Sequence, residues 1–170
     1  LLASSAASDV YKRQLITELQ SFPLNDKEAT LPAYQKRTLD TNKLLKSFSS
    51  YKKSIRNDEA SILPESFFYS NDAIKPDGTK VVQAMVHLAQ LNILDLETGH
   101  VSGYRLEGEP DFSVFKSDEK IKSYFTRVQA DDNYIYAVYW GKERWERFET
   151  PHMNIIHVYD WDGNLVQKIE

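Results

Sequence analysis

The chain contains no cysteine among its 170 residues, and this absence removes several classes of protein at once. Structural disulfides, zinc ribbons, iron–sulfur clusters and thiol nucleophiles all require cysteine. No apolar run approaches the roughly 20 residues that a membrane-spanning helix needs. The start of the chain also lacks the basic and apolar succession of a secretory signal. We therefore predict no transmembrane segment.

Catalytic and cofactor-binding motifs are missing as well. The sequence has no GxSxG, no HExxH, no Walker A motif and no GxGxxG that opens a helix. None of the histidines pairs with an acid at helical metal-ligand spacing; they are His87, His100, His152 and His157. Residues 160–164 faintly resemble the start of a calcium loop, but a hairpin turn explains them better. These absences predict no catalytic residue, no metal ligand and no cofactor.

Charge is unevenly distributed along the chain. The net charge is -4 and the pI is near 5.6, which argues against nucleic acid as a partner. The first third is nonetheless basic, with its excess in Lys43, Lys46, Lys52, Lys53 and Arg56. A patch for phosphate or a membrane surface is one interpretation, and a solvated connecting segment is the one we favour.

Acidic residues occur in two close pairs, Asp131 with Asp132 and Glu107 with Glu109. Carboxylates brought together in a cleft can serve as general acids or bases. Neighbouring acids in turns are more often simply solvated. The sequence therefore gives these pairs no specific role.

Aromatic residues are plentiful at 12%, and they cluster with β-branched residues in short runs. The clearest run is NYIYAVYW at residues 133–140, whose two alternating faces are both apolar. Aromatic and β-branched residues favour strands. A strand that is apolar on both faces is covered on both sides. Residues 134–140 are therefore predicted to be a buried strand.

The second half of the chain contains an internal repeat of turns and strands. Asp77 matches Asp131 at a spacing of 54, and Asp95 matches Asp160 at a spacing of 65. The difference indicates an insertion within residues 141–152. A further strand candidate precedes each copy, at residues 66–71 and 122–128, which makes four strands per unit.

The first third is harder to interpret. Residues 14–22 alternate in the manner of a strand and suggest an outer strand of a preceding unit. Residues 24–62 carry many charges and few paired apolar positions. We expect them to form a long connection, with a short helical stretch near residues 42–47.

A repeat of four strands that are apolar on both faces fits a β-propeller, in which each blade lies between two neighbours. A β-sandwich would show polar residues on one face of each strand. The predicted class is all-β, a propeller fragment with about two complete four-stranded blades and part of a third.

The chain also resembles a known family, the TolB-like six-bladed propellers, of the kind found in Bacteroidetes. The resembling segments are NDAIKPDGTK, QLNILDLETG, residues 110–113, RVQADDNYIYAVYWGKE, PHMN and VYDWDGNLVQKIE. The resemblance implies a six-bladed ring and a bacterial setting, either the periplasm or an outer-membrane lipoprotein. It brings no catalytic residues to this chain.

The resemblance and the repeat together give expected boundaries. Residues 1–14 resemble a translated sequencing-adaptor tail and are set aside. The other units are a partial blade with a long connection at 15–65, a blade at 66–106, a link at 107–121 and a blade at 122–170. Such an arc exposes the apolar faces of its end blades, so we expect the chain made alone to aggregate or stay partly unfolded.

The insertion at residues 141–152 suggests a binding site. Its Arg144, Trp145 and His152 are of the types found at interfaces, and it is expected on the same face as the link with Asp111 and Phe112. The alternative is that Trp145 and Phe148 fold back over the edge of the blade.

Three functions remain open on this evidence. The leading hypothesis is a non-enzymatic propeller that binds a protein, a small molecule or a carbohydrate on one face. The second is a hydrolase or lyase acting on carbohydrate or peptide, with its active site at the ring axis. The third, a purely structural envelope protein, is not distinguishable from the first by sequence.

Overall fold

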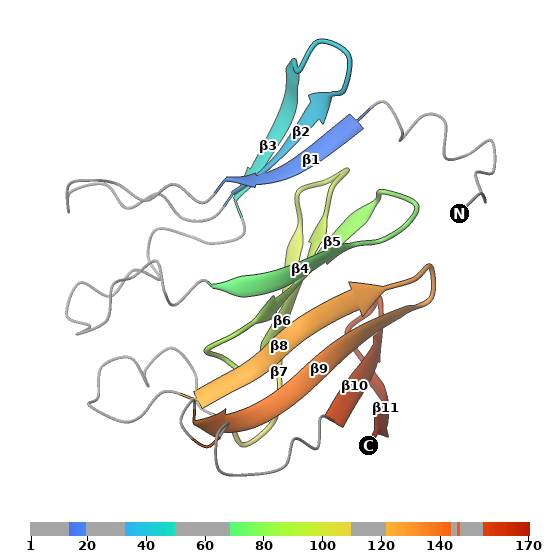
Figure 1. Ribbon diagram of the computed structural model, residues 1–170. Helices are drawn as coiled ribbons and strands as arrows, with labels where there is room; N and C mark the ends of the chain where they lie inside the picture. Colours follow the sequence, from blue (N-terminus) through green and yellow to red (C-terminus); the bar gives the residue numbers. More distant parts are fainter. Residues whose placement is uncertain (1–13, 20–32, 50–68, 110–121, 144–145, 147–154) are drawn as a thin grey trace, which may run out of the picture.

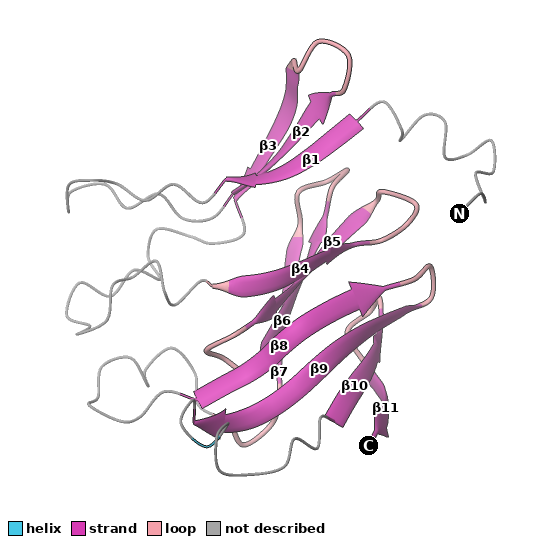
Figure 2. Ribbon diagram, in the orientation of Figure 1, coloured by secondary structure: helices cyan, strands magenta, loops and turns pink. Residues whose placement is uncertain are grey.

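The computed structural model describes residues 14–19, 33–49, 69–109, 122–143, 146 and 155–170. Within these residues the chain forms strands joined by turns, and no α-helix occurs. The strands make three antiparallel sheets that follow one another in chain order (Figures 1 and 2). The predicted all-β class is therefore confirmed.

The N-terminal sheet has the order β1-β2-β3, with β1 at Gln14–Leu19, β2 at Ala33–Thr38 and β3 at Leu44–Ser49. β1 begins at Gln14, which the sequence had assigned to the excluded tail. The predicted helical stretch near residues 42–47 is wrong, because a hairpin joins β2 to β3 there. Asn42 has a φ of 53°, which a turn requires and a helix does not allow.

The hairpin forms because its strands gain a buried cross-strand pair. Tyr34 of β2 lies opposite Phe48 of β3, and their side chains are 3% and 4% exposed. A six-residue helix would be too short to be stable and would offer no comparable contact. The many charges of this segment concealed a strand pattern that rests on these two aromatic residues.

The middle and C-terminal sheets each contain four strands in a simple meander. The middle sheet has the order β4-β5-β6-β7, at Ser70–Ile74, Lys80–Met85, Gln90–Asp95 and Val101–Arg105. The C-terminal sheet has the order β11-β10-β9-β8, with β8 at Lys122–Ala130, β9 at Tyr134–Glu143, β10 at Ile155–Asp160 and β11 at Leu165–Ile169. The predicted strand at residues 66–71 lies later, since β4 starts at Ser70.

The register of the two sheets confirms the repeat. Val81 pairs with Leu94, and Ile135, which lies 54 residues after Val81, pairs with Tyr159. Tyr159 in turn lies 65 residues after Leu94, as the sequence predicted. The first turn of the C-terminal sheet is two residues shorter than that of the middle sheet. The backbone N–H of Asp131 donates to the carbonyl of Tyr134, whereas in the middle sheet the N–H of Lys75 donates to the carbonyl of Lys80.

The sheets pack face to face, and the core lies between them. Val82, Ala84, Leu91 and Ile93 of the middle sheet share a buried cluster with residues of the C-terminal sheet, namely Tyr124, Phe125, Ile135, Ala137, Tyr159 and Trp161. The opposite face of the middle sheet packs against Tyr34 and Phe48 through Val81, Leu94 and Leu96. The middle sheet is thus covered on both sides, as a propeller blade requires.

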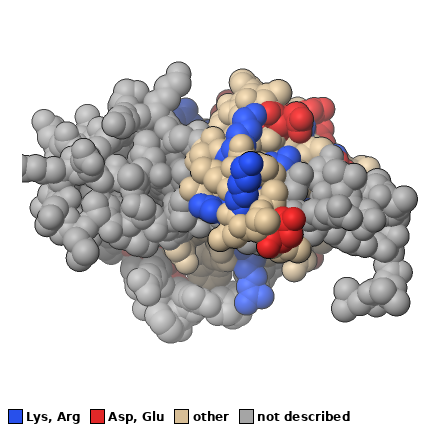
Figure 3. Space-filling model, turned by 90° about the horizontal axis from the view of Figure 1, so that it is seen from above, with Lys and Arg blue, Asp and Glu red and all other residues tan. Residues whose placement is uncertain are grey.

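Lysines and arginines are concentrated in the described part of the N-terminal sheet. Figure 3 shows several of these side chains in a row on the surface at this end of the molecule. Lys46 does more than face solvent: its Nζ donates to the carbonyl of Glu97 and lies 5.0 Å from the ring centroid of Phe48. Lys46 therefore helps to hold the N-terminal sheet to the middle sheet, whereas Lys52, Lys53 and Arg56 lie outside the described residues.

Candidate binding face

The sheets have two unlike ends. Lys122, the first residue of β8, pairs with Glu143, the last residue of β9. The link that leads into β8 and the insertion that continues from β9 therefore meet the C-terminal sheet at the same end of its strands. At the opposite end of the strands, short turns occur at residues 76–79 and 96–100 of the middle sheet and at residues 131–133 and 161–164 of the C-terminal sheet. We call the end with the long connections the loop end and the other the turn end.

The residues predicted from sequence lie outside the described residues. They are Asp111, Phe112, Arg144, Trp145 and His152. The structure describes the first residues of both segments, up to Glu109 in the link and Glu143 at the end of β9.

Glu109 is fixed at the loop end by two tyrosines. The hydroxyl of Tyr124 donates to its Oε2 at 3.0 Å, and the hydroxyl of Tyr139 donates to its Oε1 at 3.2 Å. Burial, together with the nearby Glu109 carboxylate, raises the pKa of Tyr139 to about 12, and the same causes raise the pKa of Tyr124. Both phenols therefore stay protonated and remain donors. Glu109 is a clamp on the root of the link, a role that the sequence did not reveal.

His157 lies behind this clamp in the core. Its ring stacks on Tyr139 with 4.5 Å between centroids, and its Nδ1 lies 3.1 Å from the hydroxyl of Tyr159. Burial, helped by the charge of Lys168, lowers the pKa of His157 to about 4. The neutral ring is therefore a packing element.

The turn end is built from aspartates that cap turns. The carboxylate of Asp131 accepts from the backbone N–H groups of Asn133 and Tyr134 at 2.8 and 2.7 Å. Asp77 accepts from the backbone and side chain of Thr79, and Asp95 and Asp160 cap the later turns in the same way. The backbone hydrogen bond from Tyr134 lowers the pKa of Asp131, the largest of several causes. These acids stabilise turns.

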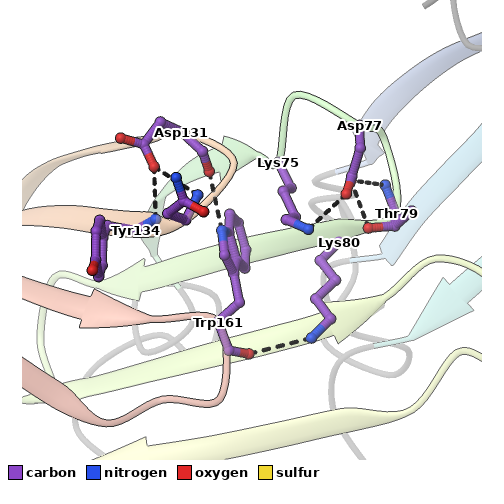
Figure 4. Close-up of polar contacts among 8 residues, drawn as sticks. Lys75, Asp77, Thr79, Lys80, Asp131, Tyr134 and Trp161 are labelled. Carbon is purple, nitrogen blue, oxygen red and sulfur yellow. Dashed lines mark hydrogen bonds and ion pairs between the residues drawn. The ribbon is translucent and has the colours of Figure 1, made fainter. Parts of the chain in front are cut away.

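Trp161 joins the two sheets at the turn end, as Figure 4 shows. Its indole N–H donates to the carbonyl of Asp131 at 3.0 Å, and its own carbonyl accepts from Lys80 at 3.3 Å. Lys75 lies 5.9 Å from the ring centroid of Trp161 and pairs with Asp77 at 2.6 Å. The hydrogen bonds and the ion pair drawn in this view connect the turns and the two sheets. The turn end is therefore structural.

Within the part of the chain that the structure describes, no group of three or more metal-ligating side chains is positioned to hold an ion. The same residues include no helix long and apolar enough to cross a bilayer. The geometry thus offers a loop end at which Glu109 is held by two tyrosines, a turn end braced by hydrogen bonds, and a packed core.

The chain has distant similarity to solved structures. Among solved structures, the chain is similar to a functionally unknown protein from Desulfotomaculum acetoxidans DSM 771, with 13% identity and a TM-score of 0.44 over 81% of this chain and 33% of that one. It is also similar to the Cps50 (Swd1) β-propeller domain of Myceliophteria thermophila, with 9% identity and a TM-score of 0.40 over 85% of this chain and 42% of that one. The chain thus spans less than half the length of either structure.

Sequence comparison gives the family. No curated protein matches the chain significantly. The model of the TolB-like 6-blade propeller-like family matches residues 15–170, which is nearly the whole chain. The three stacked sheets, the repeat and this match agree, and the chain belongs to the TolB-like six-bladed propeller family.

Proposed function

We propose that this protein is a non-enzymatic binding scaffold whose loop end receives a protein, a small molecule or a carbohydrate. The proposed contact residues are Asp111 and Phe112 of the link with Arg144, Trp145 and His152 of the insertion. The proposed blades are residues 66–106 and 122–170, with the link at 107–121. The proposed setting is a bacterial cell envelope.

The observation that carries the proposal is the contrast between the two ends of the sheets. The link and the insertion leave from neighbouring positions, because Lys122 pairs with Glu143. The link is held at its root by the Glu109 clamp, so the residues that follow start from a defined place. Long connections on a rigid scaffold are where proteins commonly place binding residues.

The proposal is tested by screening the purified protein against an oligosaccharide array and a displayed peptide library. We expect at least one ligand class to bind, and Trp145→Ala to weaken that binding at least tenfold. The matched control is Asp132→Ala, an exposed residue at the turn end. The proposal fails if neither class binds, or if Trp145→Ala and Asp132→Ala bind as the unaltered protein does. Turnover of a bound oligosaccharide or peptide would favour the hydrolase or lyase alternative.

A further inference from the structure

A row of polar side chains crosses the middle sheet at one level. Asp72 of β4 pairs with Gln83 of β5, which pairs with Asn92 of β6. Residues in direct register across antiparallel strands share one face of the sheet. This face is the one that packs against the N-terminal sheet, because Val81, two residues before Gln83, belongs to the cluster with Tyr34 and Phe48.

The members on either side of Gln83 have hydrogen-bond partners. Asp72 accepts from the hydroxyl of Tyr34 at 2.5 Å and from that of Ser70 at 2.7 Å. Asn92 Oδ1 accepts from the side-chain amide of Gln90 at 2.7 Å. The bond from Tyr34 also crosses from the N-terminal sheet to the middle sheet, so the row lies at their interface.

Gln83 is different. Its side chain is 0% exposed, and neither its Nε2 nor its Oε1 has a hydrogen-bond partner. Buried amides in native proteins are almost always satisfied, by protein groups or by ordered water. An amide with both a donor and an acceptor unmatched therefore indicates a guest that supplies both.

The fold itself does not require a polar side chain at this level. The position of Gln83 in the repeat is occupied by Ala137 in the C-terminal sheet, and the position of Asp72 by Val128. Ala137 is fully buried in the apolar cluster. The ladder thus accepts apolar residues at these two positions, although His157 keeps a polar group at the position of Asn92. The glutamine is therefore a particular feature of the middle sheet.

We propose that Gln83 binds at least one water molecule enclosed between the N-terminal and middle sheets. Water accepts from Nε2 and donates to Oε1, so it matches both atoms of the amide. A metal ion would use Oε1 alone and leave the N–H groups unmatched. The neighbouring oxygens of Asp72 and Asn92 give such a water further acceptors, in keeping with the two to four partners that buried waters have.

The direct test is NMR on the intact protein in water. We expect a nuclear Overhauser effect between water and the side-chain amide protons of Gln83, with the sign that marks a water resident for longer than nanoseconds. This measurement needs no variant, so a misfolded mutant cannot obscure it. Absence of the effect at assigned Gln83 protons would overturn the proposal.

A variant pair supplies the second test. Gln83→Met keeps the length of the side chain and removes both polar atoms, and Gln129→Met makes the same change at an exposed position of β8. We expect Gln83→Met to lower the urea midpoint of unfolding relative to Gln129→Met. A higher or equal midpoint would mean that the amide has no bound partner to lose, and would overturn the inference.

Discussion

The middle and C-terminal sheets are two copies of one ladder placed in different surroundings. In β5 the five residues from Val81 to Met85 are all buried, so both faces of the strand are closed to bulk solvent. In β9 only Ile135 and Ala137 are buried, while Tyr136 and Val138 on the other face are partly exposed. The sequence marks both faces of both strands as apolar. The difference in exposure therefore reports the neighbours of each sheet and not its own composition.

A second difference lies within the core. The position of Asn92 in the middle sheet is taken by His157 in the C-terminal sheet, at an offset of 65. Both side chains are buried, but only the histidine can gain a proton near neutral pH. The two sheets should therefore respond differently to acid, although their backbones match.

Acidification is expected to produce the largest effect. The unfolded chain has a histidine pKa near 6.5, and the fold lowers the pKa of His157 to about 4. The stability that the neutral ring provides is complete above pH 6.5 and is lost as the pH falls from 6.5 to 4, because the unfolded state binds the proton more tightly. We expect a loss of about 3 kcal/mol over this window, measured by urea unfolding at a series of pH values.

The matched variant for this prediction is His157→Asn, which installs the residue of the middle sheet. Its free energy of unfolding should be lower at pH 7 but nearly constant between pH 6.5 and 4. The capping aspartates Asp95 and Asp131 do not interfere. Their pKa values are lowered from 3.8, so the stability that their carboxylates contribute is lost below this pH window. A variant that kept the acid sensitivity of the unaltered protein would contradict the assignment to His157.

Three glycines test the contacts between sheets at equal backbone strain. Gly108, Gly99 and Gly163 have φ values of 80°, 81° and 83°. A Cβ would meet nothing at Gly108, the ring of Phe48 at 3.2 Å from Gly99, and the ring of Tyr104 at 2.3 Å from Gly163. Replacement by alanine should cost about 1 kcal/mol at Gly108 from backbone strain alone and about 2 kcal/mol more at Gly163. Gly99→Ala should fall between them.

The ranking of the three alanine variants is read from their urea midpoints. It tests whether the last turn of each four-stranded sheet packs against an aromatic ring of the preceding sheet. Gly99 of the middle sheet would contact Phe48, and Gly163 of the C-terminal sheet would contact Tyr104. Equal costs at Gly108 and Gly163 would show that the C-terminal sheet does not sit against Tyr104.

The smallest expected effect on stability compares a buried face of the middle sheet with the partly exposed face of the C-terminal sheet. Val82→Thr places a hydroxyl in the fully buried interface, and Val138→Thr places one on the partly exposed face of β9. We expect a loss of about 2 kcal/mol at Val82 and less than about 1 kcal/mol at Val138. Equal losses in thermal or urea unfolding would mean that the outer face of the C-terminal sheet is as dry as the middle sheet.

Much of the fold was predictable because the two copies of the repeat can be compared with each other. Asp95 and Asp160 cap equivalent turns, and the predicted offsets place Leu91 and Ile93 on Ile156 and Val158 in the observed ladders. The hairpin of β2 and β3 was not predicted, because charged residues outnumber Tyr34 and Phe48 in the local pattern. The partners of those aromatic residues come from the middle sheet, and a local pattern contains no information on such contacts.

The site was less predictable for a related reason. Glu109 looked like one of a pair of solvated acids, but its partners Tyr124 and Tyr139 lie 15 and 30 residues away. Gln83 is the one polar residue between Val81 and Met85, and this was the feature of the sequence that could have drawn attention to it. Its meaning depends on burial, which only the packed sheets reveal.

The short turn at Asp131 has a consequence for how such chains diverge. Two residues fewer than in the turn of Lys75 leave the strand pairing next to the turn unchanged, from Arg127 to Ala130, and β-bulges shift it only farther along β8. Additions and deletions can therefore accumulate between strands while the ladders keep their phase. Turn length is therefore the property that an engineer could vary at this position while keeping the adjoining ladder pairs in place.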